Sequence, residues 1–152
     1  MTDQTREYHL LLINDLGQER TVCLNAATYS IGRDSSNAIM IDDPTVSRQH
    51  CLFIRVPVNE SHYIYRIVDG DISGIKSRNG IHVNRTSYLE KILETQDTIQ
   101  VGAYTTMNYM IAHMTPAEFE NFFGATVLPF HTVKDEILDP TGTLTFEEST
   151  CA

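Results

Sequence analysis

Three short polar segments carry the residue types that bind anions, namely Gly32–Asp34, Ser47–His50 and Ser77–Gly80. Each contains an arginine, and the second and third add a serine hydroxyl. A phosphate group at neutral pH has a charge of about −1.5 to −2 and three acceptor oxygens, so guanidinium, hydroxyl and backbone N–H groups in a fixed arrangement hold it well. If the three segments meet in space, they form a phosphate-binding site.

The middle segment also contains the residue types of a nucleophile and its base, Ser47 and His50. In a catalytic triad these side chains face each other across the site, whereas here they lie three residues apart in one loop, without a Gly-x-Ser-x-Gly turn. The six histidines show no His-x-x-x-His spacing, and the cysteines show no Cys-x-x-Cys spacing. We therefore expect a protein that is not an enzyme and that needs no metal or other cofactor.

The charge of the chain is unevenly distributed. The net charge is −9, and residues 115–152 contribute −6 of it, with seven acidic side chains and one basic side chain. Such a protein lacks the basic face that nucleic acids require. Cationic residues nevertheless gather in or beside the three polar segments: Arg33, Arg48, Lys76, Arg78 and Arg85. This local positive charge fits a small anionic ligand better than a long polyanion.

Nothing in the sequence is typical of secretion or of membrane insertion. The N-terminus is polar, and apolar runs such as Leu10–Ile13 are far shorter than the ~18 residues that a membrane span needs. Cys23, Cys51 and Cys151 are an odd number without close spacing, so we expect free thiols and no disulfide framework. These features predict a cytoplasmic protein.

Most of the chain is typical of short β-strands. Alternating or apolar runs are separated by turn clusters such as Asp34–Asn37 and Asn79-Gly80, at intervals of roughly 8–12 residues. This spacing predicts an all-β, antiparallel sandwich or barrel. The predicted strands are Tyr8–Ile13, Arg20–Leu24, Thr28–Ile31, Ala38–Ile41, Cys51–Val56, Tyr63–Val68, Ile81–Val83, Thr98–Val101 and Thr105–Ile111.

The pattern changes after His113. Thr115 to Glu118 has a helix cap, a proline in the first turn and a glutamate three residues after the cap. Phe119, Phe122 and Phe123 then form an apolar stripe, and Gly124 can end the helix. We divide the chain into a flexible N-terminus (1–6), a β-sandwich domain (7–113), a short amphipathic helix (114–124) and a mobile acidic tail (125–152).

The order of the polar segments adds a resemblance to a known family. Gly32-Arg33 is followed fourteen residues later by Ser47-Arg48-x-His50, then by Asn79-Gly80 with Asn84 behind it, and finally by Asp97–Gly102. From about Tyr8 to Ile111, this pattern closely resembles the forkhead-associated (FHA) domain. The resemblance implies an eleven-stranded β-sandwich that binds phosphothreonine peptides without catalysis.

The resemblance also implies roles for individual residues. Arg33 and Ser47 would contact the phosphate, Arg48 would flank the phosphate or the peptide, and Asn79 would bond the peptide backbone. Arg78 stands where many relatives have threonine. The structural braces of the site would be Gly32, His50, Gly80 and Asn84. The segment from Asp69 to Lys76 is longer than in many relatives and indicates an enlarged loop beside the pocket.

The predicted function is therefore that of an adaptor which reads phosphothreonine on a partner protein in a bacterial Ser/Thr-kinase pathway. The alternative is a scaffold module that no longer depends on phosphate. A further hypothesis concerns the acidic tail, where a kinase could modify a threonine that then occupies the pocket of the same chain or of a second copy. The candidate sites are Thr132, Thr141, Thr143 and Thr145. An unmodified, solubilising tail is the simpler interpretation.

Overall fold

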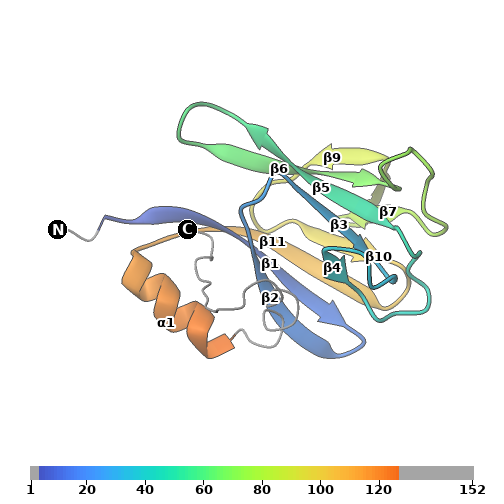
Figure 1. The fold of residues 1–152 in the computed structure, drawn as a ribbon, viewed down its shortest axis with the longest axis horizontal. Coiled ribbons are helices and arrows are strands. Elements are labelled where there is room, and N and C mark those ends of the chain that lie inside the picture. Colours follow the sequence, from blue (N-terminus) through green and yellow to red (C-terminus); the bar gives the residue numbers. More distant parts are fainter. Residues whose placement is uncertain (1–3, 127–152) are drawn as a thin grey trace.

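A computed structural model describes residues 4–126, with side chains to residue 123. Two β-sheets pack face to face, and one helix lies against an outer face (Figure 1). The first sheet has the strand order β2-β1-β11-β10-β7-β8 and the second β4-β3-β5-β6-β9. Their bounds are β1 Arg6–Asp15, β2 Gln18–Leu24, β3 Thr28–Gly32, β4 Ile39–Met40, β5 Cys51–Pro57, β6 Tyr63–Asp69, β7 Ile81–Val83, β8 Thr86–Tyr88, β9 Glu90–Ile92, β10 Thr98–Val101 and β11 Thr105–Met114.

The core lies between the sheets and is built by alternation along the strands. In β1, Leu11 and Ile13 are buried against the second sheet, whose Phe53 and Tyr65 are fully buried in the same core. Neighbouring residues of β1, Tyr8 and Leu10, point to the opposite face and are buried there as well. Because helix α1 covers that face, the run around Leu10–Ile13 is apolar without interruption.

The expected all-β sandwich of about eleven strands is confirmed. All nine strands predicted by residue range are present: six are longer by one to four residues, β7 and β10 match, and β4 is shorter by two. The segments without a predicted range, β8 and β9, are short, mostly exposed and polar, so they lack the alternation that predicts a strand. Within the described residues every strand pair is antiparallel except β3 with β4.

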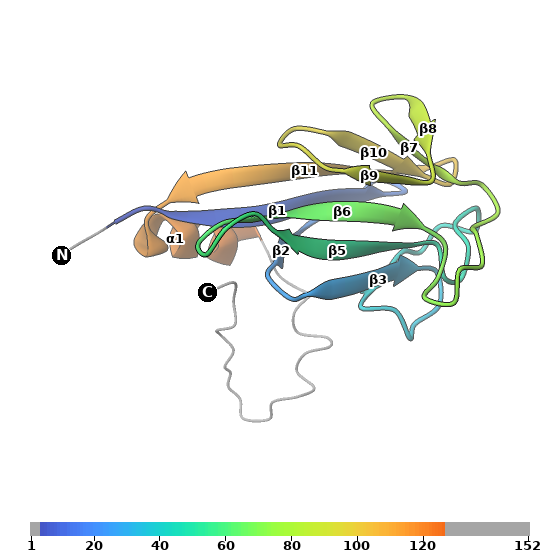
Figure 2. The ribbon, with the colours of Figure 1, turned by 90° about the horizontal axis from the view of Figure 1, so that it is seen from above.

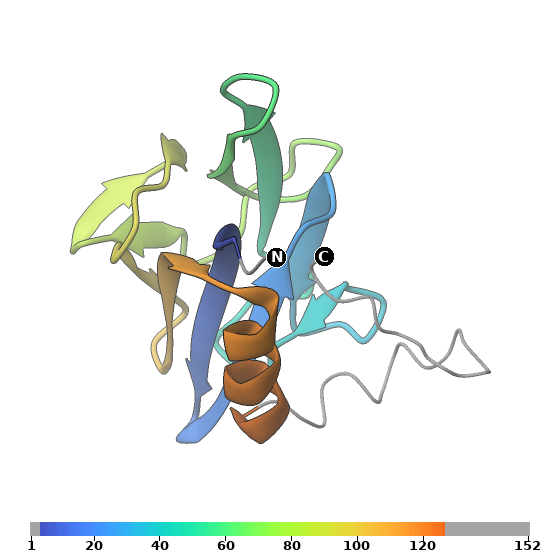
Figure 3. The same cartoon turned by 90° about the vertical axis from the view of Figure 1, so that its left-hand side faces the viewer.

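Helix α1 (Pro116–Thr126) begins at the predicted capping box. The Glu118 backbone N–H donates to Thr115 Oγ1 at 3.1 Å, and the Thr115 N–H donates to Glu118 Oε1 at 2.9 Å. Phe119 is 8% exposed and stacks on Tyr8 with ring centroids 4.1 Å apart. Figure 3 shows the helix lying beside β1 and β2.

Two details of the helix differ from the sequence expectation. Phe122 is 40% exposed, so the docked stripe is formed by Phe119 and Phe123. The helix also continues two residues past Gly124, because a glycine within a helix is only about 1 kcal/mol less favourable than alanine and does not by itself stop the helix. The acidic tail, with Thr132, Thr141, Thr143 and Thr145, lies outside the described residues.

The cysteines are only partly as expected. Cys51 is a free thiol in the core, where burial raises its pKa. Cys23 instead forms a disulfide, so the expectation of free thiols alone is wrong, and Cys151 lies outside the described residues. Among residues 4–126 there is no helix of the length and apolarity needed to span a bilayer.

Candidate functional site

The three polar segments meet at one end of the sandwich because of the way the strands of the second sheet pair. Ile31 pairs with Cys51, and Cys51 pairs with Asp69, so the ends of β3 and β6 lie beside the start of β5. The loops that follow or precede these residues therefore emerge together (Figure 2). They are the β3–β4 loop (33–38), the β4–β5 loop (41–50) and the β6–β7 loop (70–80).

Ser47 joins the three loops. Its carbonyl oxygen accepts a hydrogen bond from the Arg33 N–H at 3.0 Å, and its hydroxyl accepts one from the Arg78 N–H at 2.9 Å. The hydroxyl is a donor as well as an acceptor, so its own proton is still available for another partner. Ser47 is thus bonded to both arginine-containing loops, to one through its carbonyl and to the other through its hydroxyl.

The side chains of Arg33 and Asn79 lie against the same β4–β5 loop. Arg33 Nε donates to the Val46 carbonyl at 2.9 Å, and Asn79 Nδ2 donates to the Thr45 carbonyl at 2.7 Å. A guanidinium has five N–H groups in a fixed fork. The Nε bond therefore fixes the direction of the fork and leaves the four terminal N–H groups of Arg33 for a ligand.

His50 lies beneath these residues and is fully buried. Its Nδ1 accepts a hydrogen bond from the Ser47 N–H at 2.9 Å, which assigns the ring proton to Nε2, and Nε2 donates to the Gly80 carbonyl at 2.8 Å. Burial lowers the pKa of His50, partly offset by the bond to Gly80. A neutral ring thereby connects the β4–β5 and β6–β7 loops.

Gly32 lets the β3–β4 loop approach the β4–β5 loop closely. A Cβ at this position would collide with the Arg48 carbonyl oxygen and would lie 2.7 Å from its carbonyl carbon. The Asn37 side chain bridges the same loops, because its Nδ2 donates to the carbonyls of Asp34 at 2.8 Å and Arg48 at 2.7 Å. The close contact therefore depends on a residue without a side chain.

Asp43 is a supporting residue that the sequence analysis did not identify. Its carboxylate is fully buried and accepts hydrogen bonds from the Thr45 N–H and hydroxyl and from the Tyr104 N–H and the Thr105 hydroxyl. These bonds lower the pKa of Asp43 although burial alone would raise it. The β4–β5 loop is thereby attached to the start of β11. In the sequence, Asp42-Asp43-Pro44 has only the residue types of an ordinary turn.

Ser77 supports the third loop in a similar way. Its hydroxyl donates to Asp69 Oδ1 and accepts a hydrogen bond from the Gly80 N–H at 2.8 Å. Gly80 has a φ of 73°, a conformation that glycine adopts without strain. The Asn79-Gly80 turn is therefore held from both sides, by Ser77 and by His50.

Several cations gather at this end of the molecule. Arg33, Arg48, Lys76 and Arg78 are all exposed, and none of them is in an ion pair within residues 4–126. A hollow of about 540 Å³ against β5, β6 and β9 is also lined by arginines, but these arginines have partners. There Arg66 pairs with Glu90 at 3.0 Å, and Arg55 lies over the Tyr63 ring. Available positive charge is thus concentrated at the loop end.

Asn84 does not lie among these loops. It occupies the β7–β8 turn, where Nδ2 donates to Asp97 Oδ1 at 2.9 Å and Oδ1 accepts from the Thr98 N–H at 3.0 Å. Asn84 and Arg85 have φ values of 52° and 74°, as the two central residues of a tight hairpin turn require. Its hydrogen bonds fix this turn against β10, at the other end of β7 from the Asn79-Gly80 turn.

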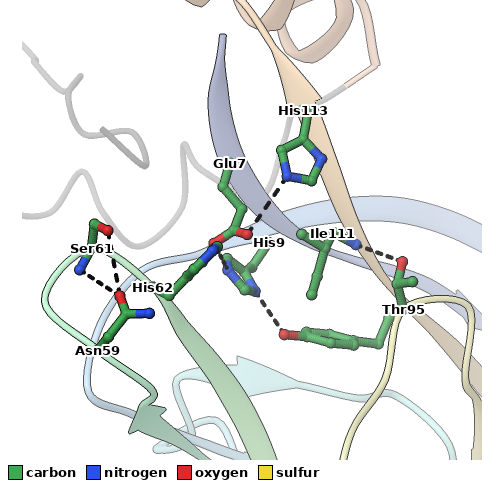
Figure 4. A network of polar contacts seen from close by, with 9 residues as sticks. Glu7, His9, Asn59, Ser61, His62, Thr95, Ile111 and His113 are labelled. Atoms are coloured by element: carbon green, nitrogen blue, oxygen red, sulfur yellow. Dashed lines mark hydrogen bonds and ion pairs between the residues drawn. The ribbon is translucent and has the colours of Figure 1, made fainter.

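A second polar cluster lies at the opposite end of the sandwich (Figure 4). The Glu7 carboxylate contacts His62 Nδ1 at 3.0 Å, His9 Nε2 at 3.4 Å and His113 Nε2 at 3.7 Å. His9 is fully buried, and its Nδ1 lies 2.6 Å from the Tyr109 hydroxyl. Burial lowers the pKa of His9, although Glu7 acts in the other direction. The negative charge in this cluster is already surrounded by its partners.

Comparison with known proteins gives consistent matches. Residues 29–102 match the family model of the FHA domain. The crystal structure of the Slr1951 protein from Synechocystis is 35% identical in sequence, with a TM-score of 0.64, over 67% of this chain and 96% of that chain. Mycobacterium tuberculosis EmbR, solved in complex with a low-affinity phosphopeptide, is 26% identical with a TM-score of 0.53, over 68% of this chain and 24% of EmbR.

Among curated proteins, the oxoglutarate dehydrogenase inhibitor of Corynebacterium efficiens is 36% identical over 81 residues, which are 53% of this chain and 50% of that protein. The chain spans half or less of the length of the curated relatives that it matches. The similarity therefore concerns the β-sandwich and its loops.

Proposed function

We propose that this chain, which belongs to the forkhead-associated (FHA) domain family, binds a phosphothreonine-containing segment of a partner protein at the loop end of its sandwich. Domains of this family bind phosphothreonine peptides. In the proposed complex, Arg33 and Ser47 hold the phosphate, Arg48 and Arg78 flank it, and Asn79 bonds the peptide backbone. The ligand is part of a protein that a Ser/Thr kinase has modified.

One observation carries this proposal, namely the position of Ser47 between Arg33 and Arg78. A phosphate in contact with the Ser47 hydroxyl would have the Arg33 guanidinium on one side and the Arg78 loop on the other. Each charge-assisted hydrogen bond contributes roughly 1.5–3 kcal/mol. Two or three such bonds, less the cost of ordering a flexible peptide, give about micromolar affinity.

The geometry also favours binding without catalysis. Both ring nitrogens of His50 are occupied by backbone groups, Nδ1 by the Ser47 N–H and Nε2 by the Gly80 carbonyl. The imidazole therefore has no free nitrogen to take the proton of the Ser47 hydroxyl, which a nucleophilic serine would require. An adaptor role in kinase signalling, rather than an enzymatic one, is our proposal.

The tail supplies a finer proposal about regulation. A phosphorylated threonine at 132, 141, 143 or 145 would compete with partner peptides, because an attached ligand has a high effective concentration. The competing proposal is a scaffold module that binds its partner without phosphate. The loop-end cations have no ion-pair partner among residues 4–126, which favours the phosphate-dependent module.

The test is retention of a phosphothreonine peptide library on immobilised protein, compared for wild type, Arg33→Ala and Ser47→Ala. We expect wild type to retain phosphorylated peptides and both variants to lose most of that retention. Equal retention of phosphorylated and unphosphorylated peptides by wild type would favour the scaffold module and overturn the proposal. Phosphorylating the tail with a threonine kinase and repeating the screen tests the regulatory part, which unchanged retention would refute.

A further inference from the structure

The cysteine of strand β2 differs from the cysteine of the core. Cys23 forms a disulfide, whereas Cys51 is a free thiol that is 1% exposed. The chain contains three cysteines, and the third is Cys151. Since Cys51 is free, Cys151 is the one cysteine of the chain that is left to pair with Cys23.

Cys23 lies on the outer face of the first sheet, where helix α1 docks. Its neighbours along β2, Val22 and Leu24, are buried in the core between the sheets, so alternation turns Cys23 to the other face. There it packs on the apolar cluster that also receives Phe119 and Phe123 of α1. Because Cys23 is half-buried on the edge strand of this sheet, a segment of chain can approach it without displacing a neighbouring strand.

We propose that the disulfide joins Cys23 to Cys151 and closes the acidic tail into a loop beside α1, in a connection that opens and closes with the redox state. Helix α1 contacts β2 and ends at Thr126, so residues 127–150 separate it from Cys151. A randomly coiled chain of about 25 residues spans roughly 25–30 Å, and an extended one spans about 85 Å. The tail is therefore long enough to return Cys151 to β2. This proposal does not depend on phosphate binding.

The bond forms by thiol–disulfide exchange with a small-molecule disulfide such as oxidised glutathione. One cysteine thiolate attacks a sulfur of the oxidant and releases one small thiol, and the second cysteine thiolate then displaces the other small thiol. The two cysteines lose two electrons and two protons in total, and the oxidant becomes two thiols. An excess of small thiol reverses both steps. The connection thus follows the ratio of small disulfide to small thiol around the protein.

The two other pairings of Cys23 are physically unfavourable. Burial raises the pKa of the Cys51 thiol, and the thiolate is the form that attacks a disulfide, so Cys51 does not take part. A bond between two copies of the chain would have to compete with an attached partner, whose effective concentration is of the order of millimolar for a flexible linker. At micromolar protein concentration the bond within one chain is therefore favoured.

The experiment maps the disulfide in the full chain by tryptic digestion without reductant. The protein is equilibrated with oxidised or reduced glutathione, free thiols are alkylated, and the peptides are quantified by mass spectrometry. Cleavage after Arg20, Arg33 and Lys134 places Cys23 in peptide 21–33 and Cys151 in peptide 135–152. Wild type is compared with Cys23→Ser and with Cys51→Ala, a matched control that removes a thiol which the proposal does not use.

With oxidised glutathione, wild type and Cys51→Ala are expected to give the two peptides joined, in at least about tenfold excess over the separate forms. With reduced glutathione both peptides should be separate and alkylated, and Cys23→Ser should give no joined pair in either condition. Separate peptides from oxidised wild type, a bond to Cys51, or two copies of peptide 21–33 joined to each other would overturn the proposal. A joined pair that persists in excess reduced glutathione would overturn the redox dependence.

Discussion

The two ends of the sandwich use charge in opposite ways. At the loop end, Arg33, Arg48 and Arg78 are exposed and have no ion-pair partner among residues 4–126, and the hydrogen bonds of His50 and Ser77 lie beneath them. At the other end, the Glu7 carboxylate lies among three histidines. One end therefore has charge available for a ligand, and the other has charge already satisfied within the chain.

This difference separates a binding site from a structural cluster. Both ends contain histidine and acidic residues, so residue type alone does not distinguish them. What differs is whether the exposed charge has a partner and whether the groups beneath hold it in place. Four substitutions or conditions test this comparison, beginning with the largest expected effect.

Gly32→Ala should have the largest effect, because its Cβ would enter the Arg48 carbonyl group. Forcing the two loops apart is expected to cost about 1–3 kcal/mol of stability, the range for overpacking, and to abolish peptide binding. Urea denaturation and peptide titration measure the two effects. Gly17→Ala is the matched control, since a Cβ there meets nothing within 4 Å and adds only backbone strain. Wild-type binding by Gly32→Ala would contradict the account.

His50→Ala should come next. It leaves the Ser47 N–H and the Gly80 carbonyl without their partner, and because both hydrogen bonds are only part-buried, the combined cost is roughly 1–3 kcal/mol. Stability and phosphopeptide affinity should therefore both fall. The control is His62→Ala at the other end, where the side chain is half exposed and its loss should leave affinity unchanged. A His50→Ala protein with normal affinity would show that the bridge does not position the pocket.

Acidification should destabilise the protein through the two buried histidines. Burial lowers the pKa of both His9 and His50, so below about pH 6.5 the unfolded chain takes up protons that the folded chain does not. Stability is therefore complete above this pH and falls below it, by up to about 1.4 kcal/mol per pH unit for each proton. Glu7 beside His9, and Asp69 and Asp43 near His50, oppose the effect. Urea denaturation at pH 7.5, 6.5 and 5.5 checks the trend, and a flat profile would contradict it.

Glu7→Gln should have the smallest effect. Its ion pairs with His62 and His113 involve exposed histidines, and such pairs contribute about 0–1 kcal/mol. We expect a small loss of stability and unchanged affinity for phosphopeptide. A tenfold loss of affinity would show that the two ends are coupled, and the comparison would then need revision.

Most of the fold could be predicted from the sequence, because alternation and turn residues are local signals. The nine predicted strands and the Thr115–Glu118 capping box are of this kind. Strands β8 and β9 could not be predicted, since each has only three residues, mostly exposed, and so shows no alternation. The exposure of Phe122 depends on where the helix docks, which its own spacing leaves open.

For the site, the sequence indicated which residues could contact an anion but not how they are held. Asp43 and Asn37 look like ordinary turn residues, and their role follows from bonds to Thr105 and Arg48, which are distant in sequence. Asn84 shows the reverse case, because its place behind Asn79-Gly80 in the chain does not bring it to the pocket. Long-range pairing decides both cases, and a single sequence does not display it.

The most direct test of the central claim is the affinity ratio between a phosphothreonine peptide and the same peptide with unmodified threonine, measured by calorimetry for wild type, Arg33→Ala and His62→Ala. We predict a ratio above about 100 for wild type and His62→Ala, from two or more charge-assisted bonds. For Arg33→Ala we predict a ratio at least about tenfold smaller. A ratio near one in wild type, or an unchanged ratio in Arg33→Ala, would contradict the assignment of the loop end as a phosphothreonine site.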